Sequence, residues 1–167
     1  MELEKAKAIA NEVVDKLKPF CERIVVAGSI RRHKSIVLDI DIVYIPANQG
    51  QFIEALKAMG KIEMGGEKLI RVKLPSIMLD IYIASPSTWA TLLLIRTGSK
   101  EHNIKLCSRA KSMGMKLHAD GSGLFRLQEN FGIFGPMAPR EERIAGDTED
   151  SIFKALNLPY LAPEKRI

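Results

Sequence analysis

Two hydrophobic periodicities alternate along the first half of this chain. Apolar residues recur at helical spacing from Leu3 to Leu17, which predicts an amphipathic helix that ends before Pro19. Runs rich in β-branched residues, such as IVLDIDIVYI at 36–45, instead predict buried strands. On these patterns we expect strands at 23–27, 36–45, 62–64, 68–74 and 77–83, and helices at 2–17, 51–59, 86–96, 100–113 and 148–157.

Turn and cap residues separate these elements. Gly65-Gly66 predicts a hairpin, and Ser85 followed by Pro86 predicts a helix start. Thr97-Gly98-Ser99 interrupts the helical pattern, so we expect a boundary between two parts of the chain there. The element order predicts an α+β fold. A mixed or antiparallel sheet with helices is followed by a small, mainly helical part with a short hairpin between 115–117 and 124–127.

The composition narrows the class of protein. At 167 residues the chain suits one compact domain, or one domain with a small appendage, and it is too short for a TIM barrel. No apolar run approaches the ~18 residues of a membrane helix, so no membrane contact is expected. Cys21 and Cys107 are far apart and lack CxxC spacing, which argues against a disulfide or zinc framework and favours a reducing, cytoplasmic location.

Positive charge gathers in the middle of the chain. The net charge is +5, and the segment from Arg96 to Arg126 alone holds seven basic and two acidic residues, an excess equal to that of the whole chain. Such a segment predicts a surface that faces a polyanion, although a solvated helix face explains the charge about as well. The basic residues that we expect to contact nucleic acid are Lys100, Lys105, Arg109 and Lys111.

Three acids lie within predicted strands. Asp39 and Asp41 are two residues apart, so both carboxylates project from one strand face, ~7 Å apart along the strand. Neighbouring carboxylates repel and ionise most easily around a cation, and Mg²⁺ prefers such ligands. Asp80 stands alone in another apolar strand, where an unpaired carboxylate is costly. We therefore expect Asp80 to lie beside the pair and to share its metal.

A second feature precedes the acid pair. Gly28-Ser29 follows the predicted strand at 23–27, where backbone N–H groups and a hydroxyl can hold phosphate oxygens. Arg32 can add charge-assisted hydrogen bonds to a triphosphate. Gly-Ser alone is an ordinary turn, but its combination with an arginine and the three acids predicts a nucleotide site.

Three segments together resemble a known family. GSIRRHKSIVLDIDIVY at 28–44 is similar to the signature of the nucleotidyltransferase superfamily, and specifically of the family X, DNA polymerase beta-like, enzymes. TGSKEHNIKLCSRAKSMGMKL at 97–117 resembles the palm–thumb junction of bacterial and archaeal members, and DTEDSIFKALNLPYLAPEKRI at 147–167 resembles the end of the thumb. The resemblance implies a nucleotidyltransferase palm over residues 1–97 and a thumb over 98–167, the minimal form of the family.

The same resemblance implies roles for the acids and their surroundings. Asp39 and Asp41 would bind two Mg²⁺ ions, for which Mn²⁺ can substitute, and Asp80 would bind the catalytic metal and accept the proton of the primer 3′-hydroxyl. The residues that would contact the incoming nucleotide are Gly28, Ser29, Arg32, Ile95, Arg96, Gly98 and Asn103. Ser29 and Arg32 would hold the β- and γ-phosphates, and Asn103 would reach the base or the minor groove.

Several positions depart from the family pattern. Ile95-Arg96 stands where an aromatic pair is common before Thr-Gly-Ser, and Leu38 stands where a small glycine often precedes the first acid. Cys107 replaces an arginine, and His118-Ala119-Asp120 replaces an Asn-Glu-Tyr run. The small Ile95 and the long, charged Arg96 predict weaker rejection of ribonucleotides than in the aromatic members.

These observations predict a Mg²⁺-dependent, template-directed DNA polymerase. It would act as a monomer on primer–template or gapped DNA with dNTPs, in short gap filling or end processing during DNA repair. Two enzyme alternatives remain open: transfer to another acceptor, such as RNA, a protein or a small molecule, and untemplated terminal addition. A third reading is a catalytically inert nucleic-acid-binding module. Primer extension on a gapped duplex with Mg²⁺ and each dNTP distinguishes them.

Overall fold

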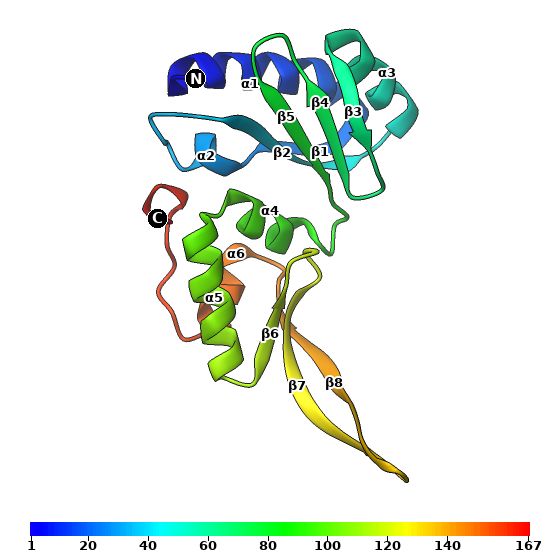
Figure 1. The fold of residues 1–167 in the computed structure, drawn as a ribbon, viewed down its shortest axis with the longest axis vertical. Coiled ribbons are helices and arrows are strands. Elements are labelled where there is room, and N and C mark those ends of the chain that lie inside the picture. The colour runs from blue at the N-terminus through cyan, green and yellow to red at the C-terminus, as the bar shows by residue number, and fades with distance from the viewer.

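The computed structural model describes residues 1–167 as two sheets with helices packed around them (Figure 1). The elements in chain order are α1 (Leu3–Leu17), β1 (Cys21–Val26), α2 (Gly28–Arg31), β2 (Asp39–Pro46), α3 (Gln49–Met59), β3 (Lys61–Gly65), β4 (Leu69–Lys73), β5 (Met78–Ile83), α4 (Trp89–Thr97), α5 (Lys100–Ser112), β6 (Met115–His118), β7 (Gly123–Gly132), β8 (Gly135–Ala145) and α6 (Glu149–Ala155). No helix is both long and apolar enough to span a bilayer. The α+β class is confirmed.

The first sheet has the strand order β1-β2-β5-β4-β3. Its central pair, β2 and β5, runs parallel, and the other pairs run antiparallel, so the sheet is mixed. One face carries the main core, where Ile40 and Ile42 of β2 are completely buried beneath α1 and α3. The opposite face carries Val43 and Ile45, which pack with residues of α4. Because side chains alternate along a strand, Asp39 and Asp41 share this second face.

The second sheet, β6-β7-β8, packs with α5 and α6 around a separate core that contains Leu106, Leu124 and Phe153. The predicted pairing of 115–117 with 124–127 is present, with Leu117 opposite Leu124. However, β7 and β8 are ten and eleven residues long, and their hairpin extends away from the body of the protein (Figure 1). The second part therefore holds more strand than its helical pattern predicts. Most of residues 126–143 is exposed, so no buried face imposes alternation on the sequence.

Two elements, β2 and α4, begin three residues later than the sequence patterns predict. Residues 36–38 are not part of β2: Ile36 pairs only with Glu2, and Leu38 is 82% exposed. The expected helix at 86–96 begins three residues later, because residues 85–88 form a turn in which Ser85 N–H donates to Thr88 Oγ1.

Buried His102 of α5 predicts a pH-dependent stability. Its ring is 3% exposed, neither ring nitrogen has a hydrogen-bond partner, and Phe153, Arg166, Lys105 and Glu149 lie near it. Burial, with the nearby Arg166 guanidinium, lowers the pKa of His102 to about 4. The unfolded chain binds a proton near pH 6.5, so the contribution is complete above that pH and is lost as the pH falls towards 4.

We expect the free energy of unfolding to fall by about 3 kcal/mol across that window from this residue. Urea unfolding at pH 7.5 and at pH 4.5 measures it. His102→Gln, which cannot titrate, is expected to lack this contribution, whereas Asp41, whose pKa of about 7 gives a pH dependence of the opposite sign, still titrates in both proteins. An unchanged pH dependence in this variant would assign the effect to other groups.

Candidate active site

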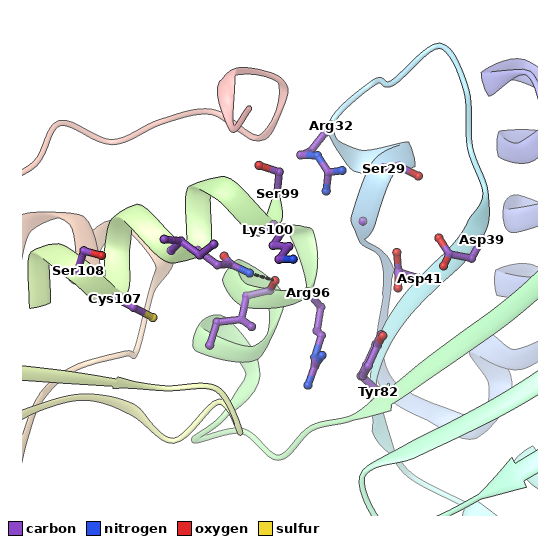
Figure 2. A pocket seen from close by; sticks show the side chains of 15 residues that line it. Ser29, Arg32, Asp39, Asp41, Tyr82, Arg96, Ser99, Lys100, Cys107 and Ser108 are labelled. Atoms are coloured by element: carbon purple, nitrogen blue, oxygen red, sulfur yellow. Dashed lines mark hydrogen bonds between the residues drawn. The ribbon is translucent and has the colours of Figure 1, made fainter. Parts of the chain in front are cut away.

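A cleft of about 650 Å³ lies between the acid-bearing face of the first sheet and the helices of the junction. Figure 2 shows its side chains, which come from α2, β2, β5, α4 and the first turns of α5. The lining residues are Gly28, Ser29, Arg32, Asp39, Asp41, Tyr82, Ile95, Arg96, Gly98, Ser99, Lys100, Asn103, Ile104, Cys107 and Ser108. All seven residues expected to contact a nucleotide, two of the three acids and Lys100 thus lie in one cavity.

Strand β2 places both acids on the wall of this cleft. Asp39 and Asp41 flank Ile40, whose side chain is completely buried on the other face of the sheet. Gly28, at the start of α2, has a φ of +57° and lies so close to Asp41 that a Cβ atom would overlap the carboxylate. Glycine is therefore required here for both its conformation and its size.

The electrostatics of the cleft favour a cation. Burial raises the pKa of Asp41 to about 7, and the carboxylates of Asp39 and Asp80 add to the rise. A hydrogen bond from Tyr82 and the charge of Arg32 oppose it. Two carboxylates on one face, short of positive charge and open to solvent on the cleft side, fit the ligand chemistry of Mg²⁺.

Asp80 was expected to bind the same metal as Asp39 and Asp41, but in the structure its carboxylate has a different partner. It lies directly beside Asp41, its partner on the parallel strand β5, as the sequence pattern implies. Its carboxylate, however, does not line the cleft: Arg71 of β4 binds both of its oxygens, with Nε–Oδ1 at 2.7 Å and Nη2–Oδ2 at 2.6 Å. No group of three or more histidine, cysteine or acidic side chains has the arrangement to hold a metal ion. The two cleft carboxylates fit a metal, whereas Asp80 is held by Arg71.

The α2 end of the cleft offers unused hydrogen-bond donors. Ser29 Oγ and Arg32 Nε are buried and have no partner. The Arg32 guanidinium is fixed at its other end, where Nη1 donates to the backbone oxygen of Thr97. Burial lowers the pKa of Arg32 from its ordinary value. A buried donor without a partner lowers the stability of the protein. Ser29 Oγ and Arg32 Nε can therefore each donate a hydrogen bond to an anionic oxygen, such as one of a phosphate.

The opposite wall is built by the α4–α5 junction. Asn103 Nδ2 donates to the backbone oxygen of Ile95 at 2.8 Å, which ties α5 to α4, while Asn103 Oδ1 is buried without a partner (Figure 2). Arg96 is not a freely mobile chain, because its guanidinium lies 4.3 Å from the centre of the Tyr82 ring. The aromatic group of this wall thus comes from β5, although the sequence has none at positions 95 and 96.

The basic residues of α5 divide into three environments. Lys100 lines the cleft, and Lys105 and Lys111 are exposed. Arg109 Nε donates to the backbone oxygen of Leu156 at 3.0 Å, so this side chain closes the end of α6. Lys105 and Lys111 therefore remain available to a polyanion, and Arg109 has a structural contact as well.

Six residues around the site were not predicted from the sequence: Tyr82, Ser99, Ile104, Cys107 and Ser108, which line the cleft, and Arg71, which binds Asp80. Tyr82 had a usable signal, because it lies two residues after Asp80 on the same strand and must share its face. Ile104 and Ser108 follow Lys100 at intervals of four residues, so a helical projection places all three on one face of α5. Arg71 gave no signal, since its contact with Asp80 depends on the register between β4 and β5.

Comparisons with known proteins find similar chains among the DNA polymerases. Residues 92–167 match the family model of the DNA polymerase beta thumb. The chain is 27% identical over 178 residues to the DNA polymerase/3′-5′ exonuclease PolX of Bacillus subtilis, with 96% of this chain and 31% of the relative covered. It is 30% identical over 167 residues to DNA polymerase lambda of Rattus norvegicus, with 85% and 28% covered.

A solved structure shows the same fold. The polymerase beta of Leishmania infantum, in a ternary P/T complex, superposes with a TM-score of 0.77 at 21% identity. The match covers 100% of this chain and 76% of that one. By contrast, the chain spans about a third of the length of the two curated relatives.

Proposed function

This chain belongs to family X of the DNA polymerases, and we propose that it transfers a dNMP from a dNTP to the 3′-hydroxyl of a DNA primer, directed by a template and dependent on Mg²⁺. The observation that carries the proposal is the single cleft that joins Asp39 and Asp41 to the unpartnered donors of Ser29 and Arg32. We assign residues 1–97 to the palm and 98–167 to the thumb. Short gap filling or end processing in the cytoplasm, by a monomer, is the setting we propose.

The cleft residues have separable tasks in this reaction. Asp39 and Asp41 would hold Mg²⁺, which supplies charge neutralisation and polarisation of the transferring phosphoryl group. Ser29 Oγ and Arg32 Nε would donate to the β- and γ-phosphate oxygens at the α2 end of the cleft. Ile95, Gly98 and Asn103 would contact the sugar and base from the opposite wall. Asp80 is in register with Asp41 but is bound at both oxygens by Arg71, so it would accept the proton of the primer 3′-hydroxyl only after this ion pair opens.

Primer extension tests the proposal. A gapped duplex, Mg²⁺ and each dNTP in turn are expected to give one addition per templating base, with only the matched nucleotide used efficiently. Additions that ignore the template would favour terminal transfer. Binding of the duplex without any extension would favour an inert binding module and contradict the proposal.

The phosphate contacts predict a split between nucleotide and DNA binding. Ser29→Ala with Arg32→Ala removes both unpartnered donors, so we expect the KM for dNTP to rise at least about tenfold, the effect of losing ~1.4 kcal/mol. The Kd for gapped DNA is expected to change by less than about threefold, since neither residue lies on the basic face of α5. Steady-state kinetics and fluorescence anisotropy measure the two constants. An equal loss of both would show that these residues support the fold instead.

The exposed lysines of α5 predict a salt-dependent interaction with DNA. Each neutralised phosphate contributes ~0.9 to the slope of log K against log salt on duplex DNA. Lys105→Ala and Lys111→Ala are each expected to lower that slope by about one and to weaken binding equally on all sequences. Anisotropy titrations across a salt series measure the slopes, with exposed Lys57→Ala of α3 as the control. Slopes that match those of the control would place the duplex elsewhere.

A further inference from the structure

Asp80 is the one acid of the constellation that is already neutralised by the protein itself. Its side chain is 4% exposed, and Arg71 occupies each of its two oxygens through a separate guanidinium nitrogen. The two residues stand directly opposite one another on β4 and β5, and Asp41 stands opposite Asp80 on the other side. Arg71, Asp80 and Asp41 therefore form a row across three neighbouring strands on the face that bears the cleft.

We propose that Arg71 is a built-in competitor for metal at Asp80: it occupies this carboxylate when no divalent cation is bound and gives way when one binds. The inference rests on the proposed function, because it concerns the metal site of that reaction. In this proposal Arg71 holds the Asp80 carboxylate in place before catalysis. It also determines the metal concentration at which Asp80 becomes a metal ligand.

The difference in exposure identifies Arg71 as the partner that moves. Its side chain is 42% exposed, whereas that of Asp80 is 4% exposed. The guanidinium can turn into water and remain hydrated there, but Asp80 cannot leave the sheet without losing its strand position. A buried carboxylate cannot stay unpaired at low cost. A cation must therefore replace Arg71 at the moment the pair opens.

The charges around the row support competition rather than simple stabilisation. Asp39, Asp41 and Asp80 face one another across β2 and β5, and Arg71 is the only cation that binds a carboxylate of this group directly. A positive charge beside the metal ligands opposes the binding of a second cation. Its removal leaves the carboxylates with uncompensated negative charge, which divalent metal relieves.

The test is metal binding by the free protein, with Mn²⁺ as the probe. Electron paramagnetic resonance of unbound Mn²⁺ gives the affinity of the full chain without any nucleotide or DNA. Arg71→Gln is expected to tighten Mn²⁺ binding by at least about threefold, because it removes the competing charge. Lys73→Gln is the matched control: Lys73 is exposed, lies two residues along on the same face of β4 and has no ion pair, so its affinity is expected to equal that of the wild type.

Asp80→Asn completes a double-mutant cycle with Arg71→Gln. In an Asp80→Asn background, Arg71→Gln is expected to raise Mn²⁺ affinity by much less than in the wild-type background, since the contested carboxylate is gone and only the charge of Arg71 near Asp39 remains. Thermal melting adds a readout independent of affinity. Arg71→Gln is expected to melt below the wild type in EDTA and to regain more of its Tm than the wild type does in saturating Mn²⁺.

Two results would overturn the inference. One is an Arg71→Gln affinity equal to that of Lys73→Gln; the other is a gain in affinity that persists undiminished without Asp80. If Arg71→Gln is poorly folded by circular dichroism, Arg71→Lys replaces it, because lysine keeps the charge but cannot bind both oxygens. An intermediate affinity then supports the proposal and an unchanged one contradicts it. Primer extension by the wild type decides the proposed function separately, so each can fail alone.

Discussion

Asp41→Asn is expected to abolish nucleotide transfer, with a loss of at least about a thousandfold in kcat, and to stabilise the metal-free protein at the same time. The carboxylate is one of two that line the cleft, so the variant loses half of the charge available to a metal there. Burial makes its charge costly and, with the repulsion from Asp39 and Asp80, raises the pKa of Asp41 to about 7. A neutral amide of the same shape removes both penalties.

The two effects have opposite signs, which makes the result diagnostic. Single-turnover primer extension at saturating Mg²⁺ measures the loss of rate, and thermal melting in EDTA measures a gain of roughly 1–3 kcal/mol in stability. Asp15→Asn, at an exposed position of α1, is the control and is expected to change neither. Near-wild-type turnover in Asp41→Asn at millimolar Mg²⁺ would refute the two-carboxylate site. A lower Tm together with lost activity would show that Asp41 supports the fold.

Glu149→Gln is expected to cost about 3–5 kcal/mol of stability. Glu149 begins α6 and lies between two arginines that are far away in the sequence. Arg31 of α2 binds both of its oxygens at 2.8 and 2.9 Å, and Arg166, which is completely buried, binds it at 3.0 Å. Burial alone would raise the pKa of Glu149, but the hydrogen bonds from Arg31 and Arg166 hold it below its ordinary value.

The amide leaves Arg166 buried with an uncompensated charge between Phe153 and Tyr160. It also leaves Arg31, the chain neighbour of the cleft residue Arg32, with only its hydrogen bond to Thr97 Oγ1. Urea unfolding followed by circular dichroism measures the loss. Asp150→Asn is the control on the same helical turn, because Asp150 pairs only with exposed Lys154, and it is expected to change stability by less than about 0.5 kcal/mol. A loss no larger than that of the control would contradict the buried network.

The alternation along β2 allowed the acid pair and its face to be predicted from the sequence. Asp39 and Asp41 alternate with apolar Ile40 and Ile42, and successive side chains of a strand point to opposite faces, so both acids share one face. Gly28, Ser29 and Arg32 were predictable for a related reason, since they lie within a few residues of a strand end. A local sequence pattern predicts which residues lie close together within a short segment. Much of the cleft comes from one such segment, residues 28–41.

Contacts between distant segments required the tertiary structure. The carboxylate of Glu149 meets Arg31 across 118 residues of chain, and no local pattern marks either residue as the partner of the other. The long β7–β8 hairpin is exposed on both faces, so it lacks the alternation that burial imposes. Asp80 shows the division most clearly. The sequence alone requires a partner for an acid in an apolar strand, but the partner is Arg71 only because β4 and β5 pair in one register, and a register is decided by the packing of the whole sheet.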